Sequence, residues 1–557
     1  MKILLIPNAI LIPEDMQKKF GKVTPAMVPL GNSSMLENIY RQYASYVDKT
    51  YIVVHEQNNI IEKFIKQKGL PIKLIKLEKL DDLGHTISES INIISEENLN
   101  IEKLYINFAD SLLEKLDNRY SDIVYSAKTE SSNLWTYFED KNGSIMSILD
   151  KKILIEKPDE ALKYEKIFVG VFCLSHPIEY LNAIKHQKEI NQTNIDSFYS
   201  GLQEYSHKYK LHFDEVATWF DVGHSESYFK AKSGVAAREF NSIIIDDRRG
   251  ILRKESENKE KLINEIKWYL KLPDNIKYLA PRIYNYSLNY DNPFVQMEFY
   301  GYHTLHESYL YGELSMLRWR EIFKKLLFII NDMEQYKVQP SKKVVCNALY
   351  NIYVEKTIRR LEQLKTNKEF RNLFIENVYI NNKKYKSLNY YISILPKLVS
   401  DIIIKKSNGV FNIIHGDLCF ANILIEDNYN FMRIIDPRGS FGEFDIYGDP
   451  YYELAKLMHS LEGHYDYIIE DLFKVSKFGN KINYTIFTKN NNIKDMFCAV
   501  FSDKLKELLP IRLIEATLFL SMVPLHSDYP TRQYVMLSTG IELLETVMKD
   551  MEVNENE

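Results

Sequence analysis

The segment from residue 411 to 457 carries polar residues whose types and order suit ATP-dependent phosphoryl transfer. A short apolar run leads to His415 and Asp417, Asn422 follows five residues later, and a second apolar run leads to Asp436. Such transfer needs a carboxylate that accepts the proton of the attacking hydroxyl, and oxygen ligands that hold Mg²⁺ on the phosphates. Asp417 is therefore the predicted catalytic base, and Asn422 and Asp436 are the predicted magnesium ligands.

This segment resembles the catalytic region of the aminoglycoside phosphotransferase and choline kinase superfamily. The order H-x-D-x-x-x-x-N, a strand and then Asp is present, and GDPYYELAKL matches the family's usual G-D-P-x-x-[DE]-L-A helix start. The resemblance implies a bilobal protein-kinase-like fold. In this family Asp449 would order the catalytic loop from a helix N-terminus; a simple helix cap is the alternative, and both roles are compatible. His415 is expected to anchor the loop through hydrogen bonds.

An ATP site also needs a cation for the phosphates and a carboxylate that holds this cation. Lys254 in ILRKES and Glu265 in LINEIKWYL fit this pairing by position. Arg253 is a rival of Lys254, because one residue of register decides which side chain faces the cleft. The QMEFY segment, which contains Glu298, resembles the hinge between the lobes of a kinase, where adenine would bind.

Two further features concern the acceptor. No G-x-G-x-x-G pattern precedes Lys254; REFNSIIID and DDRRG stand in its place. Protein kinases need that pattern more than small-molecule kinases do, so its absence favours a small-molecule hydroxyl acceptor. Arg438 could contact a phosphate or an acidic substrate, or it could pair with Glu443 or Asp445. Choline or ethanolamine would need an aromatic and acidic cage, whereas a sugar or sugar acid would need polar groups. The acceptor stays open.

The first half of the chain carries a second set of candidate residues. Asp110 follows an apolar run in LYINFADSLL, and Asp221 lies in ATWFDVGHSESYFKA. The second segment resembles the W-x-D-x-G-x-x-x-x-[YL] motif of sugar-1-phosphate and phosphocholine nucleotidyltransferases. VTPAMVPLGNSSMLENIYRQY and LGHTISESI also follow that family's layout. The resemblance implies a Rossmann-like domain in which Asp110 and Asp221 bind Mg²⁺ and hold CTP or another nucleoside triphosphate.

This half departs from that family at its phosphate-binding parts. LLIPNAILIPEDMQKKFG lacks the family's glycine-rich, Arg-containing loop, and Ala26 stands where the family has its catalytic Lys. A triphosphate would lose backbone N–H contacts and the charge that stabilises the departing pyrophosphate. We therefore expect the fold and a metal site, but not standard nucleotidyl transfer. The alternatives are a bifunctional kinase and nucleotidyltransferase, or a binding or scaffold role for this half.

The alternation of elements predicts an α/β domain followed by an α+β domain. Short apolar strands alternate with helix-like runs up to residue 235, which is typical of a mostly parallel sheet. After that come a β-ribbon, a helix ended by Pro273, and a further strand; beyond about Tyr309 the chain reads as chiefly helical apart from the catalytic ribbon. We assign residues 1–235 to the nucleotidyltransferase-like domain and 236–552 to the kinase-like domain. The elements expected in the first half are strands Lys2–Pro7, Thr50–His55, Leu104–Phe108 and Phe168–Leu174, and helices Ser34–Tyr46 and Ile87–Glu97.

The bulk composition limits the class of protein. At 557 residues the chain is too long for one ordinary domain. A net charge of −5 gives no basis for binding nucleic acid. Four scattered Cys exclude a disulfide framework and fit a reducing cytoplasm. No signal peptide or membrane span is expected, and the oligomeric state is not predicted.

Fusions of these two domain types resemble enzymes that prepare decorations for bacterial surface polysaccharides. We therefore expect a cytoplasmic, Mg²⁺- and ATP-dependent kinase that phosphorylates a hydroxyl of an amino alcohol or sugar-type molecule.

Overall fold

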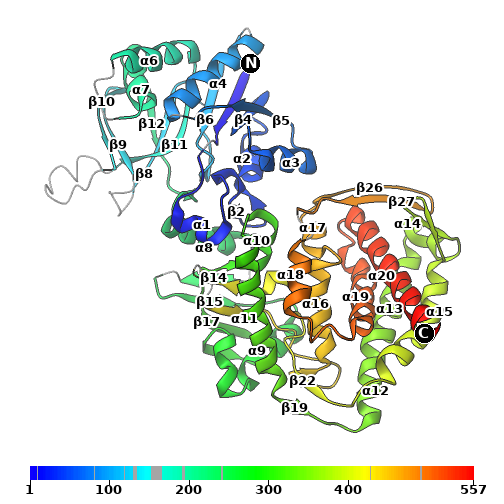
Figure 1. The fold of residues 1–557 in the computed structure, drawn as a ribbon. Coiled ribbons are helices and arrows are strands. Elements are labelled where there is room, and N and C mark those ends of the chain that lie inside the picture. Colours follow the sequence, from blue (N-terminus) through cyan, green and yellow to red (C-terminus); the bar gives the residue numbers. More distant parts are fainter. Residues whose placement is uncertain are drawn as a thin grey trace. The chain divides into compact units, whose positions relative to one another are not determined.

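The computed structural model describes residues 1–557 except 9, 81, 99, 118, 129–134, 152–165, 191–194, 240–242, 247, 427, 429, 490–491 and 557. The chain forms two compact units, Met1–Glu239 and Phe240–Glu557 (Figure 1). Residues 240–242 and 247, which belong to the turn expected to cover the phosphates of ATP, lie outside the described residues.

The N-terminal unit is built on one mixed sheet with the strand order β10-β9-β11-β6-β1-β4-β5, and β8 pairs with β11 and β12. Strands β6, β1, β4 and β5 pair in parallel, whereas β11 runs antiparallel to β6 and β8. This arrangement confirms the predicted α/β sheet. Its strands are β1 (Lys2–Pro7), β4 (Lys49–His55), β5 (Ile72–Leu77), β6 (Lys103–Asn107), β8 (Ile123–Lys128), β9 (Thr136–Lys141), β10 (Ser144–Asp150), β11 (Lys166–Leu174) and β12 (His212–Glu215).

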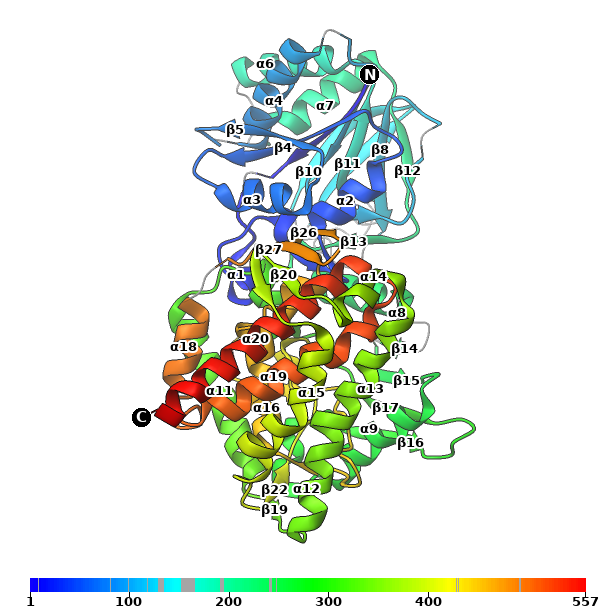
Figure 2. The same cartoon turned by 90° about the vertical axis from the view of Figure 1, so that its right-hand side faces the viewer.

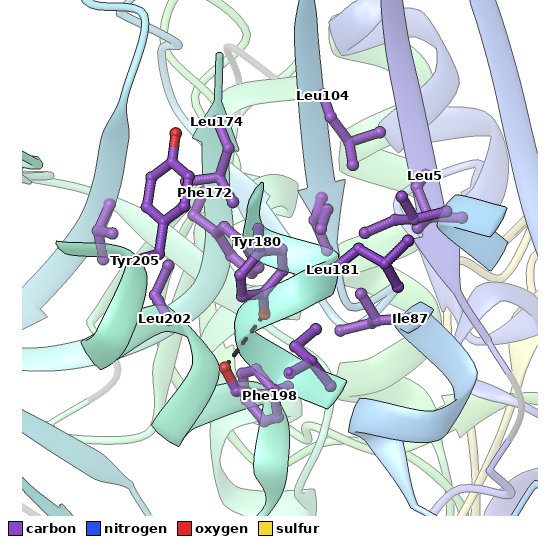
Figure 3. Packing of buried hydrophobic residues seen from close by; sticks show 14 of the residues in the cluster. Leu5, Ile87, Leu104, Phe172, Leu174, Tyr180, Leu181, Phe198, Leu202 and Tyr205 are labelled. Atoms are coloured by element: carbon purple, nitrogen blue, oxygen red, sulfur yellow. Dashed lines mark hydrogen bonds between the residues drawn. The ribbon is translucent and has the colours of Figure 1, made fainter. Parts of the chain in front are cut away.

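Helices cover both faces of this sheet. On one face, Leu5 and Leu104 pack with residues of α4, α6 and α7, and the Tyr180 hydroxyl donates a hydrogen bond to the Phe198 carbonyl oxygen at 3.1 Å (Figure 3). On the other face, the ring of Tyr105 lies 5.7 Å from that of Tyr43 in α2. Sheets buried on both faces have nearly continuous apolar strands, which is why these strands were recognisable. The helices are α1 (Glu14–Phe20), α2 (Met35–Tyr43), α3 (Asn59–Lys68), α4 (Leu83–Glu97), α6 (Pro177–Ile190), α7 (Ser197–Lys208) and α8 (Ser225–Glu239).

Two short ribbons complete this unit. Strand β7 (Ser111–Leu113) pairs antiparallel with β13 (Trp219–Asp221), and β2 (Pro29–Leu30) pairs with β3 (Ser33–Ser34). Ser34 and Glu37 form a capping box that starts α2. The β7–β13 ribbon matters most for the site, because it brings the segments around residues 110 and 221 together.

The C-terminal unit begins with an antiparallel sheet in the order β14-β15-β17-β16. Its strands are β14 (Ile243–Asp246), β15 (Ile251–Lys254), β16 (Ile283–Ser287) and β17 (Phe294–Glu298). Helix α9 (Lys259–Lys271) follows β15. The Asn258 side chain caps its start, and Pro273 comes just after its C-cap, Leu272.

Two small sheets in the same unit carry the catalytic segment. Strand β22 (Phe411–Ile413) pairs with β19 (Lys337–Val338) and β25 (Tyr447–Gly448), and β23 (Ile423–Ile425) pairs with β18 (His303–Thr304) and β24 (Met432–Ile434). The surrounding helices are α10 (Leu305–Tyr311), α11 (Met316–Glu334), α12 (Lys342–Tyr350), α13 (Lys356–Gln363), α14 (Lys368–Arg371), α15 (Leu388–Val399), α16 (Pro450–Leu461), α17 (Tyr465–Ile469), α18 (Asn492–Val500), α19 (Leu508–Met522) and α20 (Pro530–Asn556).

One helical stretch of the described chain, Leu508–His526, is long and apolar enough to cross a membrane. About two thirds of it (67%) is buried inside the structure, where α19 packs against α16 and α20 (Figure 2). This burial is what a core helix of a globular unit would show. The absence of a membrane span stays a prediction.

The helical part contains a sheet that sequence reading missed. Its strand order is β21-β20-β27-β26, formed by β20 (Val378–Ile380), β21 (Lys383–Tyr385), β26 (Phe473–Phe478) and β27 (Lys481–Ile486). The turn between β26 and β27 is Gly479-Asn480, and Gly479 has a positive φ of 59°. A Gly-Asn pair between two alternating runs is a hairpin signal that could have revealed it.

Candidate functional site

Hydrogen bonds between the His415 side chain and the backbone hold the loop after β22 in place. Nε2 of His415 lies 2.9 Å from the Ile435 carbonyl oxygen, and the Asp417 N–H donates to Nδ1 of His415 at 3.3 Å. This pattern assigns the ring proton to Nε2, in a neutral imidazole. Burial lowers the pKa of His415 to about 4, so the ring stays neutral near pH 7. His415 thus lies in the anchoring position expected for it.

Asp417 faces both a predicted and an unpredicted partner. The Asn422 amide donates to the Asp417 carbonyl oxygen at 2.8 Å. Nζ of Lys456, from α16, lies 2.8 Å from Asp417 Oδ1. Burial disfavours the charged carboxylate, but the Lys456 ammonium outweighs it and holds the pKa of Asp417 at about 2. Asp417 is therefore ionised at neutral pH and 38% of its side chain is exposed, as a base that receives a proton from a substrate requires.

The start of α16 supports the same loop. Glu453 accepts hydrogen bonds from the backbone N–H groups of His415 and Gly416, at 2.9 and 2.8 Å. Asp449 caps α16 by accepting from the Tyr451 N–H at 3.0 Å, and it also accepts from the Tyr353 hydroxyl at 2.8 Å. Asp449 thus acts as a helix cap, while the direct contacts to the catalytic loop come from Glu453, one turn further along.

Lys254 joins two of the predicted residues. Its ammonium lies 2.9 Å from Glu265 Oε2 on α9 and 2.7 Å from Asp436 Oδ1. Burial and the nearby Asp436 carboxylate raise the pKa of Glu265 to about 7. Arg253 points elsewhere, because it pairs with Glu255 at 2.8 Å and stacks 3.8 Å from the Phe294 ring centroid. The register of β15 therefore turns Lys254, and not Arg253, toward Asp436.

Asn422 and Asp436 fit a magnesium ion held together with nucleotide phosphates. Asn422 uses its amide nitrogen as donor toward Asp417, which leaves its side-chain oxygen for a cation. Asp436 has a positive φ of 57°, a conformation that Asp tolerates better than most residues. Its backbone N–H donates to the Tyr269 hydroxyl at 3.1 Å. Two protein oxygen ligands suit Mg²⁺, which is commonly bound by one or two carboxylates and substrate phosphates.

Glu298 and Arg438 lie at the edges of this group. The Glu298 side chain accepts a hydrogen bond from Tyr300 at 2.6 Å and lines a cavity of about 460 Å³ together with Tyr269 and Arg433. Arg438 donates to the Tyr452 hydroxyl at 3.1 Å. Within the described residues it pairs with neither acidic residue considered for it, and Asp445 instead pairs with Lys271.

Sequence reading missed Lys456 and Glu453. Both lie in YYELAKL, and their one-turn spacing puts them on the same side of α16. Lys456 is only 8% exposed and Glu453 only 2%. Charged residues at buried helix positions need partners. The charged pair inside an otherwise apolar helix could therefore have indicated that Glu453 and Lys456 contact polar groups of another segment.

In the N-terminal unit, Asp110 and Asp221 converge as their motifs predict. Asp221 pairs with Ser111 in the β13–β7 ribbon, and the Val222 N–H donates to the Asp110 carbonyl oxygen at 2.9 Å. A Cβ atom added to Gly223 would lie 3.2 Å from Asp221 Oδ1 and 3.4 Å from Asp110 Oδ2. Both carboxylates therefore border the same small space beside Gly223.

The two carboxylates carry more negative charge than their surroundings compensate. Asp221 is 4% exposed, and its Oδ2 atom has no hydrogen-bond partner among the described residues. Burial and the Asp110 carboxylate raise the pKa of Asp221, and burial raises the pKa of Asp110. A divalent cation would relieve both the repulsion and the unpaired oxygen. The pair thus fits a Mg²⁺ ion bound with a triphosphate.

We predict that Asp221→Asn stabilises the N-terminal unit in metal-free buffer. An acid whose pKa is higher in the folded chain favours folding less as pH rises above its unfolded pKa, because ionisation is then easier in the unfolded chain. The variant removes this penalty, so it should gain at least about 1 kcal/mol at pH 8 and little at pH 4. Calorimetric unfolding at both pH values measures the gain.

Magnesium supplies the second readout for this prediction. Mg²⁺ should raise the unfolding temperature of the wild-type protein at pH 8 and leave Asp221→Asn unchanged. Asp140→Asn, an exposed carboxylate in β9, is the matched control and should behave as wild type. Equal effects of Asp221→Asn at both pH values, or an intact response to Mg²⁺, would contradict the prediction.

Other parts of the expected triphosphate site are occupied by the protein itself. Ala26 is fully buried, and its N–H donates to the Asn8 side chain at 3.1 Å. At the start of α4, the N–H groups of Leu83 and Gly84 donate to the Asp196 carboxylate at 3.0 and 2.9 Å. These donors are therefore satisfied internally, and a nucleotide would have to displace Asp196 to reach them.

Comparisons with known proteins place the similarity in the N-terminal part. Two curated relatives, both named bifunctional protein GlmU, come from Methanococcus maripaludis strains C5 and C7. The first is 29% identical over 212 residues, which cover 37% of this chain and 48% of that protein; the second is 29% identical over 227 residues, covering 39% and 50%. The chain thus spans about half the length of the curated relatives it matches. No protein-family model matches the chain.

Solved structures give weaker likenesses. The CTP:phosphocholine cytidylyltransferase from Streptococcus pneumoniae aligns with a TM-score of 0.33 at 14% identity, over 42% of this chain and 98% of that chain. HddC from Yersinia pseudotuberculosis aligns with a TM-score of 0.30 at 17% identity, over 42% of this chain and 99% of that chain. The sequence similarity to the two GlmU proteins thus lies in the N-terminal part of the chain.

Proposed function

We propose that the C-terminal unit transfers the γ-phosphoryl group of ATP to a hydroxyl of a small molecule. The observation that carries this proposal is the convergence of Lys254, Glu265 and Asp436, which are distant in sequence but joined by contacts of 2.7 to 2.9 Å. Asp417 and Asn422 lie on the adjoining loop, within hydrogen-bond distance of each other. Together these residues provide a phosphate-binding cation, oxygen ligands for Mg²⁺ and a base.

Each residue has a defined part in this reaction. Lys254, held by Glu265, would bind the α- and β-phosphates of ATP. Asn422 and Asp436 would hold Mg²⁺, which neutralises charge on the phosphates when bound. Asp417 would orient the acceptor hydroxyl and take its proton as the new O–P bond forms. The bond between the γ-phosphorus and the β–γ bridging oxygen breaks, and ADP leaves with that electron pair.

We propose a more limited activity for the N-terminal unit. Asp110 and Asp221 would bind a nucleoside triphosphate with Mg²⁺, but transfer would be slow or absent. Buried Ala26 provides no charge for the departing pyrophosphate, and Asp196 fills the start of α4. The kinase would then supply phosphorylated sugar-like building blocks, as in bacterial surface polysaccharide synthesis, while the N-terminal unit binds a nucleotide.

A screen with two readouts tests both proposals on the whole protein. ADP and pyrophosphate formation are followed with ATP, CTP and UTP, over amino alcohols, sugars, sugar phosphates, sugar acids and polyols. We expect acceptor-dependent ADP from ATP and no pyrophosphate from CTP or UTP. If no acceptor yields ADP, the kinase proposal fails. Robust pyrophosphate release that Asp110→Asn abolishes would instead establish a bifunctional enzyme.

A further inference from the structure

Four cationic side chains, which we term the basic cluster, gather around Tyr452 next to Asp417. They are Lys356 and Arg360 of α13, Arg438 of the loop after β24, and Lys456 of α16. The Arg438 guanidinium carbon and Nζ of Lys356 both lie 6.0 Å from the centroid of the Tyr452 ring. Lys456 lies one helical turn after Tyr452 and contacts Asp417 at 2.8 Å.

Most members of the basic cluster lack a carboxylate partner in the part of the chain that the structure describes. Within the described residues, Lys456 has a carboxylate partner, whereas the other three do not. Arg438 donates to the Tyr452 hydroxyl, and Arg360 donates to the Ser521 carbonyl oxygen at 3.2 Å. The carboxylates at the start of α16 accept hydrogen bonds from other groups, Asp449 from Tyr353 and Tyr451 and Glu453 from backbone N–H groups, and within the described residues neither forms an ion pair with the cluster. Three of the four basic side chains therefore lack an ion-pair partner among the described residues.

Lys356, Arg360 and Arg438 are half-buried, so solvent screens their charges incompletely. Burial, with the charges of Arg438 and Arg360, lowers the pKa of Lys356 well below its usual range. Burial and the Arg438 charge also lower the pKa of Arg360. Crowded cations without counter-charges are unfavourable unless an anion binds among them. The cluster thus has the properties of an anion site that is built into the unit.

We propose that the phosphoryl acceptor is itself a phosphate monoester, and that the basic cluster binds its phosphate beside Asp417. This inference rests on the proposed kinase function. Guanidinium groups match phosphate oxygens in two-pronged hydrogen bonds, and ammonium groups add point charges. Three basic side chains without a carboxylate partner in the described chain suit a dianionic monoester better than the single charge of a carboxylate. Lys456 links the two parts, because it lies in the cluster and contacts the base.

The acceptor is thus inferred to be a phosphorylated sugar or polyol with a free hydroxyl. Choline and ethanolamine are disfavoured, because the cluster would repel their cationic groups. The inference stands on the contacts of the cluster alone.

Matched pairs of compounds test this inference on the full-length protein. ADP formation is measured with three matched pairs: glycerol and glycerol 3-phosphate, ribose and ribose 5-phosphate, and glucose and glucose 6-phosphate. Glucuronate and choline are tested as a carboxylate and a cationic acceptor. We expect at least tenfold higher kcat/KM for a phosphorylated member than for its parent. Lys356→Gln should reduce that preference at least tenfold through KM. Preference for a neutral sugar, glucuronate or choline, unaffected by Lys356→Gln, would overturn the inference.

A binding measurement separates this inference from the kinase proposal. Denaturant unfolding is followed with rising inorganic phosphate in EDTA, at constant ionic strength, so that metal-bound phosphate does not contribute. Phosphate should stabilise the wild-type protein and the control Lys365→Gln, at a lysine whose side chain is 40% exposed and pairs with Glu362, but it should not stabilise Lys356→Gln. Stabilisation without kinase activity would reject the proposed function and keep the anion site. If phosphate stabilises all three proteins equally, the phosphate is an adventitious ion only. This result, combined with an unchanged acceptor preference of Lys356→Gln, would reject the anion site.

Discussion

Replacement of Asp417 by Asn should lower ATP-dependent phosphorylation of the acceptor by at least about a hundredfold, as the loss of a general base does. Asn keeps the size of the side chain, and the Asn422 amide still donates to the backbone oxygen of residue 417. Binding of Mg-ATP should persist, because Lys254, Glu265 and Asp436 are untouched. The loss should therefore appear in kcat and not in the affinity for nucleotide.

Because Lys456 pairs with Asp417, a loss of activity in Asp417→Asn could also come from a destabilised fold. A second substitution at Lys456 provides the control. Asp417→Asn leaves the ammonium of Lys456, 8% exposed, without a charged partner, which should destabilise the C-terminal unit. The double variant Asp417→Asn with Lys456→Met removes both charges. It should recover stability in denaturant unfolding but stay as inactive as the single variant.

The two measurements distinguish a missing base from a damaged fold. If activity returns with stability in the double variant, the loss came from the structure and Asp417 is not the base. Near wild-type turnover of the single variant on its true acceptor would reject the same assignment more directly.

The sequence predicted those strands, helix ends and site residues that short local patterns determine. Buried β-strands such as Lys2–Pro7 showed continuous apolar runs, and Asn258 and Pro273 marked the start and end of α9. Asp110 and Asp221 could be paired in advance, because each follows its own recognisable motif. In these cases neighbours along the chain determine the structure, so single-sequence reading suffices.

Contacts between segments that are distant in the sequence could not be predicted. Lys456 meets Asp417 only because α16 packs behind the catalytic loop, and nothing near Asp417 in sequence indicates a cation there. The choice between Arg253 and Lys254 depended on the register of β15, which pairing with β17 determines. Asp196 accepts the hydrogen bonds at the start of α4 although it lies more than a hundred residues away in the sequence. The sequence therefore showed the missing glycines and Lys of the expected triphosphate site, but not that Asp196 occupies part of it.

The basic cluster illustrates the same limit for function. Its members come from α13, the loop after β24 and α16, and Arg438 alone was recognisable as a candidate for an anion. The sequence left open whether Arg438 pairs with a neighbouring acid or meets a substrate. In the fold, Asp445 pairs with Lys271, and within the described residues Arg438 forms no ion pair with Glu443, so Arg438 is available for an anionic group of the acceptor.

The second large effect is expected at Asp436. Asp436→Asn should remove the magnesium-dependent part of ATP binding and raise the Kd for Mg-ATP at least about tenfold, because a neutral amide replaces an anionic ligand of the cation. Asn is the informative substitution here. Residue 436 has a φ of 57°, and Asn adopts this left-handed conformation readily, whereas Ala would add backbone strain to the change of ligand.

Calorimetric titration of ATP with Mg²⁺ and with EDTA measures this effect. Wild-type protein should bind more tightly with Mg²⁺, and Asp436→Asn should bind similarly in both buffers. Lys254 keeps its contact with Glu265 in the variant, so binding in EDTA should persist and serves as the internal control for folding. An unchanged affinity for Mg-ATP would exclude Asp436 from the metal site. The contact between Asp436 and Lys254 would then be a structural ion pair, and the kinase proposal would lose the convergence on which it rests.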